Sequence, residues 1–403
     1  MKAGWKTVKL ADVAEMRPPK SEAKLKGLKP TDEVGFLPME DLTQFQKHAK
    51  ALKTRTMSEV SNSYTYFADG DVLMAKISPC FQNGKMGIAT GLPNGVGYGS
   101  SEYFVFRPSK ELSAEWLFYY LQDPSFRRHA TGKFSGNVGQ QRLPKELIEE
   151  LEIPLPPLAE QKRIVALLDE AFAGIDTLSS NAKTRSSEAL CVFEQERDSF
   201  FANPDNKYTE TTVSDITTRL QYGTSEKSAS TGRYVVLRMG NIQDGEIDYE
   251  DLKYTSSQEV IDQYALKPGD VLFNRTNSPQ WVGKSAIYRG EMPAVFAGYN
   301  IKIHTIADKI NSEFLTFFLN SDRAMSFGRS TFISSVNQAN INAEKLRSYR
   351  LPLPPLREQK AIADRLGQIR KMSRALAAIY QNSLAQSEHL KAAILRSAFN
   401  GTL

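Results

Sequence analysis

Several features that define particular classes of protein are scarce in this sequence. Its 403 residues include two cysteines, Cys80 and Cys191, whereas a secreted domain of this size normally carries more disulfide pairs, so we expect a reducing cytoplasm. The chain does not open with an apolar signal-peptide stretch, and it holds no run of about 18 apolar residues, so neither export nor a membrane span is predicted. The four histidines are scattered without metal-ligand spacing, which argues against a zinc site.

Motifs of enzymes that act on nucleotides or DNA are also missing. An adenine methyltransferase needs an acidic residue or Asn before Pro-Pro-aromatic, but the Pro-Pro pairs here lie in RPPK and twice in LPPL. SPQWVGKS resembles a phosphate-binding loop, except that Ser278 stands in place of its leading glycine. GVGYG at 95–99 precedes a strand-like run, which favours a turn. A nuclease pattern built on Pro204, Asp205, Asp251 and Lys253 arises too often by chance to count.

The composition is that of a globular protein with a small excess of positive charge. Apolar residues make up 41% of the chain and charged residues 24%, and 51 Lys and Arg oppose 46 Asp and Glu, for a formal charge of +5. The length suits two or three domains. The charge permits a polyanionic partner without requiring one.

The sequence contains one long internal repeat. TVKLADV at 7–13 matches ETTVSDI at 210–216, and GDVLMAK at 70–76 matches GDVLFNR at 269–275. IPLPPLAEQK at 153–162 then matches LPLPPLREQK at 351–360. The order is preserved while the offset shrinks only from 203 to 198 residues, so the chain is predicted to be two copies of one module.

Each module has a globular part followed by a long helix. Short β-like runs, turns and a short amphipathic helix (AEWLFYYLQD or SEFLTFFLNS) predict a mixed α/β domain. Residues 158–201 and 356–399 contain no proline and predict helices of about 65 Å. Apolar positions stepping by three and four predict an antiparallel coiled-coil seam, formed by Leu168, Ala171, Ile175, Leu178, Ala182, Arg185, Ala189 and Val192 and by Ile362, Leu366, Ile369, Ser373, Leu376, Tyr380, Ser383, Ser387, Leu390 and Ile394.

The predicted fold class is therefore α/β (α+β), with a pseudo-twofold internal repeat. Globular domains occupy 1–153 and 204–351, and the helical regions occupy 154–203 and 352–403. Because the two helices run antiparallel, the end of the second helix should return to the first domain, which would bring Leu403 near Met1.

The proline-rich segments before the helices have two interpretations. A residue that precedes proline is driven out of the helical region, so IPLPP and LPLPP must be extended, and the last proline of each suits the first helical turn. They are either stiff joints between domain and helix or docking surfaces for another subunit, and both can hold. The residues concerned are Pro157, Glu160, Gln161, Lys162, Pro355, Glu358, Gln359 and Lys360.

These segments, together with SGNVGQQRLPKELIEELE, SVNQANINAEKLRSYR and the ending RSAFNGTL, resemble the specificity subunit of type I restriction-modification systems. The resemblance covers essentially the whole chain, twice. It implies two target recognition domains that each read half of a split DNA sequence, separated by antiparallel spacer helices. It further implies two docked modification subunits, which methylate adenine with S-adenosylmethionine, and a motor-nuclease subunit in the restriction complex. No cofactor is expected on this chain itself.

Residues that contact double-stranded DNA are predicted in two segments of each module. The first segments are KISPCFQNGK at 76–85 and RTNSPQWVGK at 275–284, and the second are GKFSGNVGQQR at 132–142 and GRSTFISSVNQANIN at 328–342. Lys and Arg neutralise phosphates, and Arg, Lys, Asn, Gln, Ser and Thr read base edges. The candidates are Lys76, Ser78, Gln82, Asn83, Lys85, Lys133, Gln140, Gln141, Arg142, Asn274, Arg275, Thr276, Asn277, Gln280, Lys284, Arg329, Asn337, Gln338 and Asn340.

The sequence thus favours a non-catalytic DNA-recognition subunit that gives its specificity to methyltransferase partners. Because the modules differ widely between their shared segments, the two half-sites should differ. Two alternatives stay open: a DNA methyltransferase or nuclease with an unrecognised site, and a coiled-coil scaffold that binds protein only.

Overall fold

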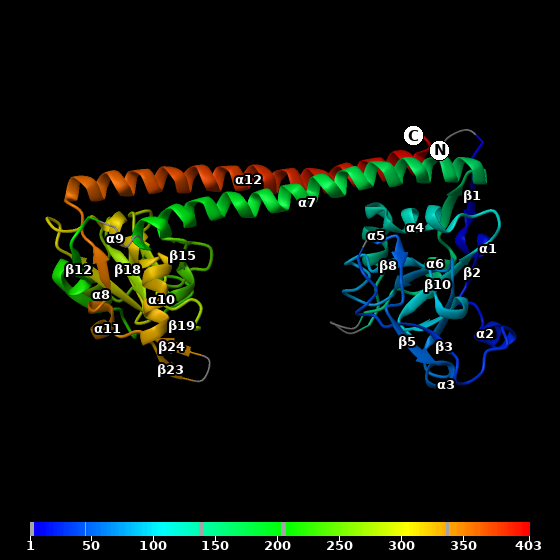
Figure 1. The fold of residues 1–403 in the computed structure, drawn as a ribbon, viewed down its shortest axis with the longest axis horizontal. Helices are drawn as coiled ribbons and strands as arrows, with labels where there is room; N and C mark the ends of the chain where they lie inside the picture. Colours follow the sequence, from blue (N-terminus) through cyan, green and yellow to red (C-terminus); the bar gives the residue numbers. More distant parts are fainter. Residues whose placement is uncertain (1–3, 45, 137–140, 203–206, 336–337) are drawn as a thin grey trace. The chain divides into compact units, whose positions relative to one another are not determined.

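The computed structural model describes residues 4–44, 46–136, 141–202, 207–335 and 338–403. The chain forms two compact units, shown in Figure 1. Unit 1 is Met1–Ala182 with Asn382–Leu403, and unit 2 is Lys183–Gln381. Each unit therefore holds one globular domain and parts of both long helices.

Unit 1 alternates short strands and helices before its long helix. Its strands are β1 (Lys6–Lys9), β2 (Ala14–Met16), β3 (Glu33–Leu37), β4 (His48–Ala49), β5 (Lys53–Thr56), β6 (Thr65–Ala68), β7 (Val72–Ala75), β8 (Met86–Ala89), β9 (Val96–Gly99), β10 (Tyr103–Pro108) and β11 (Glu152–Leu155). Its short helices are α1 (Leu10–Val13), α2 (Ser21–Leu25), α3 (Met57–Val60), η1 (Pro93–Gly95), α4 (Ala114–Gln122), α5 (Pro124–Thr131) and α6 (Lys145–Glu149).

The central strand β7 explains how unit 1 is layered. It lies between β10 and β8 in the five-stranded sheet β2-β10-β7-β8-β4. All four residues of β7, VLMA, are buried, because Val72 and Met74 pack in the core that includes α4 while Leu73 packs against the sheet β5-β3-β9-β6. A strand covered on both faces needs such a continuous apolar run. The pair β1-β11 ties the first strand to the segment that enters the long helix.

Unit 2 has a similar succession of elements. Its strands are β12 (Glu210–Thr212), β13 (Thr217–Tyr222), β14 (Tyr234–Leu237), β15 (Ile242–Gln243), β16 (Glu246–Ile247), β17 (Tyr254–Thr255), β18 (Val271–Asn274), β19 (Thr276–Asn277), β20 (Ser285–Ile287), β21 (Ala294–Phe296), β22 (Asn300–Thr305), β23 (Ile333–Ser335), β24 (Gln338–Asn340) and β25 (Arg350–Pro352). Its short helices are η2 (Val213–Ile216), η3 (Met239–Asn241), α8 (Gln258–Tyr264), α9 (Ser312–Leu319), α10 (Asp322–Thr331) and α11 (Ala343–Arg347).

The internal repeat is visible in the sheets. The order β13-β22-β18-β20 in unit 2 corresponds to β2-β10-β7-β8 in unit 1, and the pair β12-β25 corresponds to β1-β11. Val271 and Phe273 of β18 pack in the core that includes α9, while Leu272 points to a second core with β14 and β21. The duplicated mixed α/β module predicted from the sequence is confirmed.

Both long helices form where they were predicted, as α7 (Leu158–Ala202) and α12 (Leu356–Asn400). They pack against each other within each unit and run antiparallel. In unit 1, Lys391 of α12 lies 2.5 Å from Asp176 of α7. In unit 2, the Ser186 hydroxyl donates to the carbonyl of Ala377 over 3.4 Å, and farther along α7, Glu196 pairs with the earlier residue Arg365.

The seam between the helices is only partly the predicted one. Leu168, Ile175, Ala182 and Ala189 are buried as expected, and so are Leu366 and Ser373 of the second stripe. Leu178, Val192 and Leu376 are instead 63%, 53% and 44% exposed.

Small residues account for the shift of the seam. Ser186 is buried in place of the exposed Arg185, and Ala377 is buried in place of Leu376. The Ser186 hydroxyl also accepts a hydrogen bond from the Gln381 amide, over 3.1 Å. Short side chains let the two backbones approach closely. A heptad pattern counts apolar residues and does not take side-chain size into account, so it does not predict these positions.

Residues near both ends of the chain meet in unit 1, as predicted. Trp116 of α4 contacts Trp5 at 5.7 Å and Phe399 of α12 at 4.9 Å between ring centroids. Arg163 of α7 donates to the carbonyl of Leu403 over 2.8 Å. Met1 lies outside the described residues.

Candidate nucleic-acid interface

The fold brings together the two polar segments predicted separately in unit 1. Ile77 and Ser135 each form a β-bridge with Arg142. The backbone N–H of Ser78 donates to the carbonyl of Gln141 over 2.9 Å, and the N–H of Gln141 donates back to the Ser78 hydroxyl over 3.2 Å. The described residues of these segments, 76–85, 132–136 and 141–142, therefore form one polar surface, the unit 1 site.

Positive charge gathers at this site. Arg142 is exposed and makes a two-fold contact with Glu102, at 3.0 and 2.9 Å. These hydrogen bonds lower the pKa of the Glu102 carboxyl. Burial lowers the pKa of the nearby Lys76 ammonium, and the positive charges of Arg17 and Arg142 act in the same direction. Three cations near one carboxylate leave an excess of positive charge for an anion.

Arg17 is a member of this cluster that sequence reasoning missed. It is exposed, and its φ of 58° lies in the left-handed region that residues other than glycine seldom adopt. Nothing in the RPPK segment that holds Arg17 indicates that its charge would act on the Lys76 segment.

The remaining candidates of unit 1 differ in accessibility. Asn83 and Lys133 are exposed, while Ser78, Gln82 and Gln141 are half-buried. The Lys85 ammonium donates to the carbonyl of Met39 over 2.7 Å, so it supports the neighbouring loop. Gln140 lies outside the described residues.

Unit 2 joins its two predicted segments in the same way. Strand β19 pairs with β24, and Thr276 stands opposite Asn340. The Asn340 amide donates to the Thr276 hydroxyl over 3.0 Å, and the N–H of Ile341 donates to the carbonyl of Arg275 over 2.9 Å. We call this surface the unit 2 site.

Arg275 is held at the centre of the unit 2 site. Its guanidinium lies 4.8 Å from the centroid of the Tyr222 ring and donates to the carbonyl of Gly298 and to Asn340, over 3.3 and 3.1 Å. Tyr222 is 42% exposed, and Tyr299, whose carbonyl accepts from the N–H of Arg275 over 2.9 Å, is 48% exposed. These tyrosines were missed because they lie far away in the sequence from both predicted segments.

Asn274 is a structural residue and not a DNA contact. Its side chain is fully buried, and its amide lies within hydrogen-bonding distance of the carbonyls of Thr276 and Tyr299 and the side chain of Asn300, at 3.2–3.3 Å. Thr276 is also buried, at 8% exposure, and its hydroxyl serves Asn340. Both predictions are corrected because a buried side chain cannot reach a base edge.

The other candidates of unit 2 lie at or near the surface. Gln280, Arg329 and Gln338 are exposed, and Asn277 and Asn340 are half-buried. Arg329 donates to Ser326 and Asp322, over 2.7 and 3.2 Å. Lys284 lies 3.9 Å above the exposed Trp281 ring, and burial lowers the pKa of its ammonium. Asn337 lies outside the described residues.

The repeated proline segment forms a joint around one buried glutamine in each unit. Gln161 accepts from the N–H of Ser113 over 2.8 Å and donates to the carbonyls of Glu111 and Pro156, both over 2.8 Å. It ties the loop before α4 to the start of α7.

Gln359 repeats the arrangement in unit 2. It accepts from the N–H of Asn311 over 2.8 Å and donates to the carbonyls of Lys309 and Pro354, over 2.9 and 2.8 Å. Both glutamines are 0% exposed. Their predicted contact with a partner subunit is therefore corrected, because every polar atom of each amide already serves the joint.

The other joint residues remain accessible. Pro157 and Pro355 precede the helices, and their carbonyls accept the first helical hydrogen bonds, from Glu160 and Glu358 over 2.8 Å. Both prolines, Lys162 and Lys360 are exposed, and Glu160 and Glu358 are half-buried. Glu160 pairs with Arg163 at 2.7 Å and Glu358 accepts from Tyr208 over 2.6 Å. A docking role for these six residues remains a prediction.

The helices carry an exposed apolar surface that was not singled out from the sequence. Met372, Leu376 and Ile379 of α12 are 72%, 44% and 64% exposed, and their spacing of four and three places them on one face. We call them the α12 stripe. Contiguous exposed apolar side chains mark interaction surfaces. The α12 stripe was missed because Leu376 was assigned to the seam.

In the described ranges, no three His, Cys, Asp or Glu side chains come together to hold a metal ion, and none of the helices there is long and apolar enough to cross a membrane. The duplicated scaffold thus presents two related but different polar surfaces, one in each unit.

Comparison with known proteins names the family. The model of the type I restriction modification DNA specificity domain matches residues 2–184 and 211–382, so the chain belongs to this family and carries two such domains. The EcoEI specificity subunit of Escherichia coli is 34% identical over 182 residues, covering 45% of this chain and 30% of that subunit. The EcoKI specificity subunit of Escherichia coli (strain K12) is 24% identical over 319 residues, covering 74% and 68%. The chain thus spans about a third of the EcoEI subunit.

Solved structures share the fold. A chain from a structural study of complex assembly and conformational transition of the type I R-M system covers 100% of this chain and 99% of its own length, at 18% identity and a TM-score of 0.81. The HsdS subunit from Thermoanaerobacter tengcongensis covers 100% and 98%, at 19% identity and a TM-score of 0.60. The chain therefore shares the fold of these solved structures, and it carries two domains of the DNA specificity family.

Proposed function

We propose that each unit reads one half of a split, asymmetric double-stranded DNA target and that the chain, itself non-catalytic, confers this specificity on methyltransferase partners. One observation carries the proposal: in both units the fold pairs the same two polar segments, although the side chains they present differ. Arg142 lies on one paired segment of unit 1, while Arg275 and Asn340 face each other across the pair in unit 2. Different side chains on equivalent scaffolds read different bases.

Charge at the two sites supports contact with the DNA backbone. Lys76, Arg142 and Arg17 gather in unit 1, and Lys284 and Arg329 lie on or beside the segments of unit 2. Cations of this kind neutralise phosphates and fix the protein on the duplex, while the amide side chains nearby supply base contacts. The long helices would set the separation of the half-sites, as the spacing between paired DNA-binding modules generally does.

The proposed partners are two modification subunits, one for each repeat, which would bind S-adenosylmethionine and methylate adenine in the cytoplasm. Support comes from the α12 stripe and from the exposed prolines and lysines of the joints. A motor-nuclease subunit would complete a restriction complex. This chain needs no cofactor of its own in the proposal.

Methylome sequencing tests the reading of DNA. The chain is expressed with its modification subunit, and the methylated sequences are compared for the wild type, Lys76→Ala and Arg275→Ala. Each variant should relax or lose one half-site and leave the other half-site and the spacer unchanged. Arg350→Ala, at an exposed arginine on β25, which pairs with β12, is the matched control. Unchanged methylation by both variants would remove these residues from the site.

A second measurement separates the proposal from a catalytic role. The purified chain is incubated with duplex DNA and labelled S-adenosylmethionine, with and without the modification subunit. Methyl transfer is expected only in the mixture, and transfer by the chain alone would overturn the non-catalytic assignment. Salt-dependent binding of duplex DNA by the mixture would argue against a scaffold that binds protein only.

A further inference from the structure

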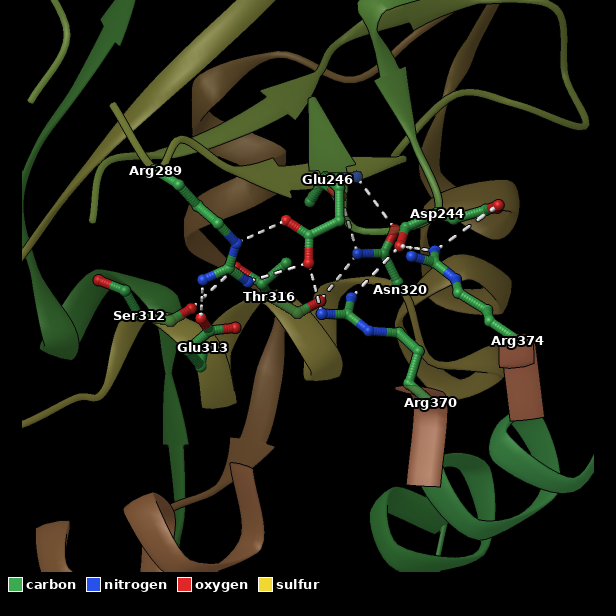
Figure 2. Close-up of polar contacts among 10 residues, drawn as sticks. Asp244, Glu246, Arg289, Ser312, Glu313, Thr316, Asn320, Arg370 and Arg374 are labelled. Carbon is green, nitrogen blue, oxygen red and sulfur yellow. Dashed lines mark hydrogen bonds and ion pairs between the residues drawn. The ribbon is translucent and has the colours of Figure 1, made fainter. Parts of the chain in front are cut away.

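The globular domain of unit 2 is fastened to α12 by a network of ion pairs. Glu246 on β16 accepts two hydrogen bonds from Arg289, at 2.8 and 2.9 Å, and forms an ion pair with Arg370 of α12 (Figure 2). The side chains of Arg370 and Glu246 are only 12% and 25% exposed. Arg374, one turn further along α12, donates to the carbonyl of Asp244 over 3.2 Å. Here the globular domain supplies the acid and the helix supplies the base.

The globular domain of unit 1 is fastened to α7 with the opposite polarity. The Lys47 ammonium lies 2.6 and 2.8 Å from the two carboxylate oxygens of Asp169 on α7. The same carboxylate accepts from the Tyr119 hydroxyl over 2.5 Å. The side chains of Lys47 and Asp169 are 22% and 41% exposed. The globular domain now supplies the base and the helix supplies the acid.

Lys47 and Glu246 lie within one residue of equivalent places in their domains. Ile88 pairs with Val72 in unit 1 as Ile287 pairs with Val271 in unit 2, so these isoleucines correspond. The N–H of Ile88 donates to the carbonyl of Lys47 over 2.8 Å, and the N–H of Ile287 donates to the carbonyl of Gly245, next to Glu246, over 3.2 Å.

The helical partners also correspond closely. Asp169 is eight residues beyond Gln161, and the residue eight beyond Gln359 is Gly367, three residues before Arg370 on the same face. The difference in charge between the two helices extends beyond these single positions. Residues 164–182 hold three acids and no base, whereas the matching residues 362–380 hold four bases and one acid.

We propose that this inversion of charge is a pairing code that determines which globular domain can seat on which helix. A domain with lysine at the Lys47 position fits the acidic start of α7, and a domain with glutamate at the Glu246 position fits the basic start of α12. The proposal concerns the seating of the domains and is independent of which DNA sequence each domain reads.

The physical basis is the cost of a like-charge contact in a half-buried place. A domain of unit 1 placed ahead of α12 would bring Lys47 toward Arg370 in place of the acid Glu246, and Glu115 of the same domain would be the acid that remains near Lys47. Two cations removed from bulk water repel each other more strongly than they would on an open surface, and each loses its compensating partner. A chain that exchanges its two globular domains would therefore also need to change the charge at the Lys47 and Glu246 positions.

The test transplants one domain within the full-length chain. A copy of residues 5–153 replaces residues 208–351, so that the copy runs into α12 through the joint. Lys47→Glu is then introduced in that copy alone, and Lys50→Glu in the copy, an exposed lysine three residues further on, is the matched control. Thermal unfolding, together with hydrogen exchange of residues 362–380 of α12, which occur only once in the chain, reports how well the transplanted domain is seated.

Lys47→Glu in the copy should raise the unfolding midpoint by about 2–8 °C, the change expected for one or two favourable contacts in a domain of this size. Lys50→Glu should leave it unchanged. The native chain gives a second arm that does not require the transplant to fold: Lys47→Glu should lower the midpoint by a similar amount, and adding Asp169→Lys should restore most of it. The code is refuted if Lys47→Glu fails to stabilise the copy or if Asp169→Lys fails to rescue. Both readouts are independent of DNA, so a failure of the proposed function would leave them unaffected.

Discussion

Gln359→Leu should destabilise unit 2 strongly although leucine fills nearly the same volume. The glutamine amide is fully buried and makes three hydrogen bonds, to the N–H of Asn311 and to the carbonyls of Lys309 and Pro354. Leucine leaves these backbone groups without that partner, and each buried polar group left unsatisfied costs about 1–3 kcal/mol. Since water can reach part of a relaxed joint, we expect a total loss of about 2–5 kcal/mol in the free energy of unfolding.

The assay is urea unfolding followed by circular dichroism, combined with hydrogen exchange of the α9 peptide. Asn311 is the N-cap of α9, so faster exchange should begin there. Gln368→Leu makes the same chemical change at an exposed place on the same helix and should stay within about 0.5 kcal/mol of the wild type. If Gln359→Leu and Gln368→Leu were equally stable, the joint would not depend on the buried amide and the reasoning would fail.

Three further predictions concern charge and the helix surface. Burial alone would raise the pKa of Glu246, but the guanidiniums of Arg289 and Arg370 outweigh it and lower that pKa below its ordinary value of 4.5. The ion pairs therefore stabilise unit 2 above about pH 4.5 and are lost as the pH falls below it, and Glu246→Gln should flatten this acid dependence in unfolding measurements. Arg142→Ala should reduce the slope of log affinity against log salt by about one, measured on the complex with duplex DNA, whereas an unchanged slope would exclude a phosphate contact. Replacing the α12 stripe with serines should weaken co-purification of the modification subunit while circular dichroism stays unchanged, and full retention would locate the docking surface elsewhere.

Local patterns and the repeat were enough to predict the scaffold. The helices α7 and α12 begin at the predicted residues, 158 and 356, because proline segments and proline-free polar runs are local signals. The short helices around Trp116 and Phe314 were likewise recognised from their apolar spacing. The seam was harder, since Ser186 and Ala377 are buried by close backbone approach and not by their own hydrophobicity.

In the candidate sites, the segments could be predicted from local composition, but the roles of single residues could not. The polar segments were recognisable from composition, but composition could not distinguish Asn274, buried in a hydrogen-bond network, from Asn83 at the surface. Arg17 belongs to the unit 1 site only because its charge acts on the distant Lys76, and Tyr222 belongs to the unit 2 site only because its ring contacts the distant Arg275.

By itself the sequence determined the duplication, the mixed α/β class, the position of the helices and the two polar segments of each module, because all of these depend on order and spacing along the chain. The tertiary structure alone decided that the two segments of each module meet and that Gln161 and Gln359 are buried in the joints. It also decided that the domain of unit 1 contacts its helix through a base and the domain of unit 2 through an acid. Those outcomes depend on pairs such as Lys47 with Asp169, which are 122 residues apart. Contacts over such separations are set by packing and burial of the whole domain, which no local pattern records.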